Sequence, residues 1–138
     1  RSGGVRESGA FLLASNDRRR RTVTRVAYFD DLDEQSLTGG ITFHSHGFER
    51  LWSMCATERL RVVADVHTHG GTFVQQSPID RANPMIAKAG HVAIIVPHLA
   101  QQPVFAEQCG VHIYRGAHQW DPAVDGDARR RLYIGRWA

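Results

Sequence analysis

The stretch RVVADVHTHGG, residues 61–71, decides the fold. Its first six residues are mostly β-branched or apolar, so they predict a strand that runs directly into the histidines and ends at the two glycines. Side chains two residues apart project from the same face of a strand, so His67 and His69 point together while Thr68 points away. Two imidazoles placed in this way at a strand's end can bind one metal ion.

The residues that follow offer a third ligand. Catalytic zinc usually has three protein ligands, with nitrogen or oxygen donors at about 2.0–2.2 Å, and keeps a fourth position for water. Gly-rich residues 70–76 let the chain turn back, and Ser77-Pro78 suits an N-cap followed by proline at the first helical position. The first turn of that helix places Asp80 where it faces the strand end, with Ser77 on the same side. A capping box or a His-x-His is ordinary by itself, whereas the two in register indicate a metal site.

Two strands, a short third strand and a helix are predicted before this site. Residues 10–14 are an apolar run and residues 22–29 are rich in β-branched and aromatic residues, so they predict a hairpin with its turn at Asn16-Asp17. Residues 41–43 favour a further strand. Residues 47–60 predict an amphipathic helix, because their apolar positions recur near helical spacing. Those positions are Phe48, Leu51, Trp52, Cys55 and Leu60.

An interrupted helix and three strands are predicted after the site. Pro84 does not fit inside a helix, so we expect a kink there or a restart capped by Asn83, with Gly90 closing the helix. Strands and helices alternate along the chain, so the fold class is α/β or α+β, with a mixed sheet between helices in a single domain over residues 1–138. The three expected strands are residues 91–96, residues 110–115 and, as a last edge strand, residues 131–134.

The composition is that of a globular protein. Apolar residues make up 42% and charged residues 22% of the chain, and no run approaches the roughly 20 apolar residues of a membrane span. The first residues carry no apolar signal region, so we expect a cytoplasmic protein with Cys55 and Cys109 reduced. The basic residues concentrate in the runs Arg18–Arg21 and Arg129–Arg131 without interleaved aromatics. Nucleic-acid binding is therefore not expected, and the first run is interpreted as a solvated turn.

With Glu7 just before the first strand, the sequence resembles the JAMM/MPN metalloproteases, whose hallmark is such a glutamate followed by His-x-His-x7-Ser-x2-Asp. The resemblance covers nearly the whole chain and implies that family's cytidine-deaminase-like core, a mixed, mainly antiparallel curved sheet sandwiched by helices. It implies that His67, His69 and Asp80 bind one catalytic Zn²⁺ with its water. It also implies that Glu7 handles the proton of that water and that Ser77 donates a hydrogen bond to the developing oxyanion.

The same resemblance implies a hydrolase, a zinc-dependent peptidase or isopeptidase that cleaves after the C-terminal tail of a ubiquitin-like protein. Similar bacterial domains accompany ubiquitin-like activating and conjugating enzymes, including those of antiviral defence systems. Gly70-Gly71 stands where family members commonly have proline after the second histidine, and the span from Gly90 to Arg115 leaves no room for a long second insertion. The chain is thus similar to minimal bacterial and archaeal members, and its substrate preference is less transferable.

Three alternatives stay open at this stage. Maturation of a sulfur-carrier protein by cutting after its Gly-Gly tail would use the same chemistry. A non-catalytic MPN scaffold usually lacks one or more of the ligands, whereas all five motif positions are kept here. A structural zinc site generally uses four protein ligands and thiolates, and neither Cys55 nor Cys109 falls in the motif.

The sequence contains a second His-x-His, His44-Ser-His46, with Glu49 three residues later. It lacks the spaced serine and aspartate, so its expected use is to line the substrate groove. By strand parity Asp65 lies on the side of His67, which makes it a candidate to hydrogen-bond a ligand imidazole. The other histidines are interpreted as structural or solvent-exposed, and the tryptophans as packing residues. They are His91, His98, His112 and His118, and Trp52, Trp120 and Trp137.

Overall fold

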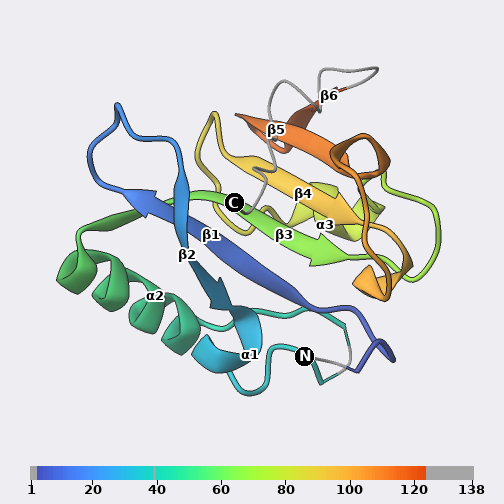
Figure 1. The fold of residues 1–138 in the computed structure, drawn as a ribbon, viewed down its shortest axis with the longest axis horizontal. Helices are drawn as coiled ribbons and strands as arrows, with labels where there is room; N and C mark the ends of the chain where they lie inside the picture. The colour runs from blue at the N-terminus through green and yellow to red at the C-terminus, as the bar shows by residue number, and fades with distance from the viewer. Residues whose placement is uncertain (1–2, 39, 124–138) are drawn as a thin grey trace. The chain divides into compact units, whose positions relative to one another are not determined.

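The structure, a computed structural model, describes residues 3–38 and 40–123. Within these ranges the strands are β1 (Gly9–Ser15), β2 (Val23–Tyr28), β3 (Leu60–Thr68), β4 (Val92–Val96), β5 (Gly110–Gly116) and β6 (Gln119–Ala123). The helices are α1 (Phe29–Leu32), α2 (Ser45–Glu58) and α3 (Pro78–Ala82), with short 3₁₀ turns at His98–Ala100 and Ala106–Gln108. The strands form one sheet in the order β2-β1-β3-β4-β5-β6 (Figure 1). The α+β class is therefore confirmed.

The chain divides into two compact units, and the division falls inside β3, between His67 and Thr68. The single domain over residues 1–138 stays a prediction. The pairs β1–β2 and β1–β3 in the first unit are antiparallel, as are β4–β5 and β5–β6 in the second. None of the helices in the described residues is long and apolar enough to cross a membrane.

The first unit begins with the predicted hairpin of β1 and β2, which is confirmed (Figure 1). Its turn is stabilised by Asp17, whose side chain accepts a hydrogen bond from the Arg19 N–H at 3.0 Å and whose carbonyl accepts one from the Arg20 N–H at 2.9 Å. Strand β1 also pairs with β3, and this register sets Gly9 opposite His67. The start of strand β1 therefore lies beside the first histidine of the motif.

Aromatic rings fill the core of the first unit. The Phe11 ring of β1 lies 4.9 Å from that of Phe29 and 5.2 Å from that of Phe43, and Phe48 of α2 lies 4.7 Å from Phe43. The predicted strand at residues 41–43 is wrong. The Thr42 N–H donates instead to the Ser36 carbonyl at 2.9 Å, and Phe43 turns its ring into this cluster.

The predicted amphipathic helix is confirmed as α2, with shifted ends. The helix starts two residues early, at Ser45, and ends at Glu58, because Arg59 takes a left-handed conformation with φ 53°. Leu60 is consequently the first residue of β3. Leu51 and Cys55 are buried four residues apart, whereas Trp52 is 48% exposed and stacks on Phe48 with ring centroids 6.5 Å apart. Trp52 is thus a packing residue, as interpreted from the sequence, but it lies just off the buried stripe and outside the core.

The second unit has its core on β4 and β5, both predicted. Its buried side chains include Ile94, Ile95 and Val111. Strand β6 was not expected; it follows a turn in which Ala117 and His118 have φ of 49° and 57°. Such left-handed turns usually carry glycine or asparagine, and because neither residue is present at these two positions, no hairpin was predicted there.

Two further predictions concern the second unit. Helix α3 begins at the predicted N-cap Ser77, but it ends at Ala82 and is not resumed after Pro84. The predicted restart is wrong, because the Asn83 N–H and side-chain amide both donate to the Ile79 carbonyl and close the helix, and Gly90 lies in a separate turn. The expected strand at residues 131–134, the arginine run at residues 129–131 and Trp137 lie outside the described residues.

Candidate metal centre

Three side chains of the His-x-His and Ser-x-x-Asp motifs lie together. His67, His69 and Asp80 each offer a ligand atom, and these atoms lie within 4.8 Å of one another. Both histidines are buried and Asp80 is half-buried. It is the one such group of three or more potential ligands in residues 3–38 and 40–123.

The tautomer of His69 can be assigned from its surroundings. Its Nδ1 lies 2.9 Å from the Phe73 carbonyl oxygen, which can only accept, so Nδ1 carries the proton and donates it. In the neutral ring Nε2 is then an acceptor, and it lies 3.4 Å from Asp80 Oδ2. The contact is favourable when either a proton or a metal ion lies between these two atoms. Two ligands in a tetrahedron with zinc bonds of about 2.0–2.1 Å are about 3.3 Å apart, so this pair fits zinc.

Asp80 is positioned by the N-terminus of α3. The Ser77 N–H donates to Asp80 Oδ2 at 2.8 Å, and the Asp80 N–H donates to Ser77 Oγ at 3.1 Å, so the two residues form a capping box. The same carboxylate oxygen that caps the helix faces His69. Because Ser77 Oγ accepts from Asp80, its hydroxyl proton can be donated elsewhere.

The backbone of His69 is hydrogen-bonded to the last residue of β4 and to the segment that follows this strand. The His69 N–H donates to the Val96 carbonyl at 2.9 Å, and the His69 carbonyl accepts from the Leu99 N–H at 2.9 Å. His98 N–H likewise donates to the Gly71 carbonyl at 3.0 Å. His98, Leu99 and Ala100 all have φ between 52° and 55°, a conformation that costs about 1–2 kcal/mol per residue without glycine. Such strain persists where surrounding contacts impose it, here next to the candidate ligand.

The loop between His69 and Ser77 is anchored a second time by a residue that the sequence did not single out. His112 is buried, and its Nε2 lies 3.0 Å from the Val74 carbonyl oxygen, to which it donates. Gly110 lets this contact form, because a Cβ there would lie 1.8 Å from the same oxygen. His112 is thus structural, as interpreted from the sequence, but nothing in the local pattern indicates its partner, which is 38 residues away.

The remaining motif residues belong to the first unit. Asp65 is buried on the face of His67, and its Oδ2 lies 4.0 Å from His67 Nδ1, so a hydrogen bond from a ligand imidazole to Asp65 stays a prediction. Glu7 is exposed, two residues before Gly9, which pairs with His67. Its carboxylate makes no hydrogen bond or ion pair with the described part of the chain and is not in the three-residue cluster.

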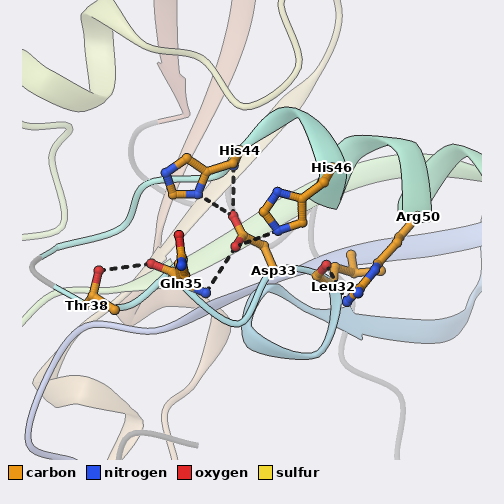
Figure 2. A network of polar contacts seen from close by, with 7 residues as sticks. All are labelled: Leu32, Asp33, Gln35, Thr38, His44, His46 and Arg50. Atoms are coloured by element: carbon orange, nitrogen blue, oxygen red, sulfur yellow. Dashed lines mark hydrogen bonds and ion pairs between the residues drawn. The ribbon is translucent and has the colours of Figure 1, made fainter.

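His44 and His46 bind a carboxylate that the sequence reasoning missed (Figure 2). Asp33 is fully buried, and its Oδ2 accepts from both the N–H and the Nδ1 of His44, at 2.8 and 2.7 Å. His46 Nε2 lies 3.1 Å from the other oxygen, which also accepts the Gln35 N–H at 3.0 Å. The two imidazoles stack with an interplanar angle of 7°. Through these contacts His44 and His46 hold the start of α2 against Asp33. That the two histidines line a substrate groove stays a prediction.

Loss of the Asp33 charge is expected to destabilise the protein in a pH-dependent way. Burial acts to raise the pKa of Asp33, but hydrogen bonds from His44 and Gln35 outweigh it and lower the pKa from 3.8 to about 2. A depressed pKa adds stability that is present above about pH 3.8 and is lost as the pH falls through about 2. Asp33→Asn should therefore lower the free energy of unfolding by about 2 kcal/mol near neutral pH.

Urea unfolding of both proteins at several pH values measures this effect. The difference between wild type and Asp33→Asn should narrow as the pH drops from about 4 to about 2. Glu49→Gln, an exposed acid on α2, is the matched control and should show no such trend. A difference that stays constant over this range would contradict the role given to the Asp33 charge.

Both cysteines are buried free thiols, Cys55 in the first unit and Cys109 in the second. Burial raises the pKa of each thiol, and Glu58 adds to the effect at Cys55. A raised pKa disfavours the thiolate, which is the form that binds metal. The ligands at the candidate centre are thus nitrogen and oxygen atoms.

Fold and site together define an α+β protein with a three-ligand histidine and carboxylate cluster at the end of a strand. No family model matches the sequence. Among solved structures the chain is similar to protein DSY2949 from Desulfitobacterium hafniense, determined in solution, with a TM-score of 0.53 and 19% sequence identity. The match covers 85% of this chain and 75% of that one. At this identity the likeness supports the fold alone.

Proposed function

We propose that the protein is a zinc metallopeptidase of the JAMM kind, with His67, His69 and Asp80 as metal ligands. The observation that carries the proposal is the 3.4 Å approach of His69 Nε2 to Asp80 Oδ2, with the His69 proton committed to Phe73 on the other ring nitrogen. Hydrogen bonds that orient ligands from outside are the usual support of a zinc site. Three protein ligands, rather than four, correspond to a catalytic ion.

The reaction proposed is hydrolysis of a peptide or isopeptide bond. A zinc ion held by His67, His69 and Asp80 would supply an acidified water and would polarise the carbonyl to be attacked. Glu7 would accept the proton of the attacking water and return it to the leaving amine. The Ser77 hydroxyl donates a hydrogen bond to the carbonyl oxygen as negative charge develops there, while Ser77 Oγ still accepts from the Asp80 N–H. Glu7 is exposed, and this role requires that the chain before Gly9 lies along the bound substrate.

The substrate proposed is the C-terminal tail of a ubiquitin-like protein, cleaved during precursor processing or deconjugation. This choice rests on the resemblance of the motif to JAMM/MPN enzymes, including those that accompany activating and conjugating enzymes in the bacterial cytoplasm. Maturation of a sulfur-carrier protein shares the chemistry and differs in the protein that bears the Gly-Gly tail. Non-catalytic MPN scaffolds usually lack one or more metal ligands, whereas His67, His69 and Asp80 are all present here, which favours catalysis over a scaffold role.

Glu7→Gln is expected to keep one zinc per chain and to lose cleavage of a ubiquitin-like fusion by about 10²–10⁴-fold, the usual contribution of a general base. Zinc content by mass spectrometry and single-turnover cleavage of the fusion measure the two outcomes. Glu49→Gln, another exposed glutamate, is the control and should cleave like wild type. Full activity in Glu7→Gln, or wild-type protein without stoichiometric zinc, would overturn the proposal.

A further inference from the structure

Strand β2 is an open edge of the sheet. It lies at the end of the strand order and pairs only with β1 among the described strands (Figure 1). Val23, Val26 and Tyr28 are 39%, 43% and 38% exposed, although all three are large apolar side chains. The strand contains no proline, and its one charged side chain, Arg25, is paired within the chain with Glu58 at 3.3 Å.

The two ends of β2 carry opposite charge. At its N-terminal end the hairpin turn presents Arg18–Arg21, all exposed, and only Arg20 lies near a carboxylate of the described residues, 3.9 Å from Asp17. At its C-terminal end the chain passes directly into α1, where Asp31 is exposed, and Glu34 follows, also exposed. One cation reaches this end from α2, because the Arg50 guanidinium donates to the Leu32 carbonyl at 3.2 Å, and the two exposed acids outnumber it. A basic end and an acidic end are therefore separated by the length of one strand, about 20 Å.

We propose that β2 is a self-association edge, at which two copies of this chain pair their β2 strands antiparallel about a twofold axis. Antiparallel pairing sets the N-terminal end of one strand beside the C-terminal end of the other. Arg18–Arg21 of one copy then meet Asp31 and Glu34 of the second copy, and the contact occurs twice. The exposed apolar side chains of β2 cover one another between the two charged ends.

A second copy fits this edge better than other extended partners. An acidic peptide would be attracted to Arg18–Arg21 but repelled by Asp31 and Glu34 at the other end, and the same holds for a nucleic-acid strand. The pairing to β1 shifts register between Leu13 and Ala14, so the regular part of β2 is short. An edge of six residues is small beside the roughly 1,200 Å² of a stable complex, so we expect a weak, salt-sensitive dimer.

Sedimentation velocity over a range of protein concentrations tests the proposal. Wild type should shift from monomer to dimer as concentration rises, with a dissociation constant that increases with salt. A variant that carries Arg18→Glu, Arg19→Glu, Arg20→Glu and Arg21→Glu together makes both ends of β2 acidic, and Asp31→Arg with Glu34→Arg makes both basic. Each should weaken self-association by about tenfold or more, because four or more charge contacts change sign. An equimolar mixture of the two should regain dimer.

Two controls separate this pairing from general charge effects. Glu49→Arg changes an exposed charge on α2 and should leave the dimer unchanged. Val26→Lys, which places a charge in the middle of the edge, should abolish the dimer while the circular dichroism spectrum stays that of the wild type. A wild type that is monomeric at every concentration, a dimer that survives both charge reversals, or a mixture that fails to associate would each overturn the proposal. So would a monomer that binds an acidic peptide or an oligonucleotide through Arg18–Arg21.

Discussion

His69→Ala is expected to abolish stoichiometric zinc binding, which we predict to be one ion per chain in the wild type. The substitution removes Nε2, the proposed metal-binding atom beside Asp80. It also removes the Nδ1–H group that donates to the Phe73 carbonyl. Two protein ligands remain, and the loop that leads to Ser77 loses the hydrogen bond at Phe73, while those at Gly71 and Val74 remain. The loss of affinity should exceed the 10–100-fold that removal of an outer hydrogen bond costs at zinc sites. Competition with a chromophoric chelator measures it.

The control for this experiment is another histidine of the same pattern. His46→Ala changes a half-exposed imidazole bound to Asp33 and outside the candidate centre, so zinc binding should be retained. Retention of full zinc affinity by His69→Ala would remove His69 from the ligand set. Equal losses in both variants would show that the zinc is bound nonspecifically by histidines.

Gly110→Ala is expected to have the largest effect on stability. A Cβ at this position would lie 1.8 Å from the Val74 carbonyl oxygen and 2.9 Å from His112 Nε2. The first contact is with backbone, so β5 or the loop must move, and the hydrogen bond from His112 to Val74 is lost with it. We expect the free energy of unfolding to fall by about 3 kcal/mol or more. Urea unfolding of the two proteins measures the change.

Gly71→Ala provides the matched control, because an added Cβ there meets nothing within 4 Å and the residue has no left-handed φ. Its effect on stability should stay within about 1 kcal/mol, in either direction. The zinc affinity of Gly110→Ala should fall as well, since Val74 lies in the loop that joins His69 to Ser77. A Gly110→Ala protein as stable as Gly71→Ala would contradict the close approach of β5 and this loop.

Features fixed by local chemistry could be predicted from the sequence. The turn at Asn16-Asp17 and the apolar runs beside it specify the first hairpin, because each works through residues close in the chain. Ser77-Pro78 specifies the start of α3 for the same reason. The placement of Asp80 beside His69 could also be anticipated, since strand parity and one helical turn restrict where these side chains lie.

The features that escaped prediction depend on partners far along the chain. Asp33 gains its role from His44, 11 residues later, and His112 from Val74, 38 residues earlier. Strand β6 follows a turn whose left-handed residues have side chains, so its conformation is imposed by pairing with β5 and not by the turn sequence. Glu7 is the residue of the motif for which the family resemblance alone, and no contact in the described chain, indicates a role.

The capping box of α3 has a thermodynamic consequence for the candidate centre. A helix of five residues does not persist by itself in water, so α3 depends on the hydrogen bonds between Ser77 and Asp80. The carboxylate oxygen that closes this cap is the one that faces His69. A metal that binds only the capped form stabilises the cap by its own binding free energy. By reciprocity, a substitution that weakens the cap lowers the affinity for the metal. Residues 77–80 are thus under one constraint, because helix start and ligand geometry cannot vary independently there.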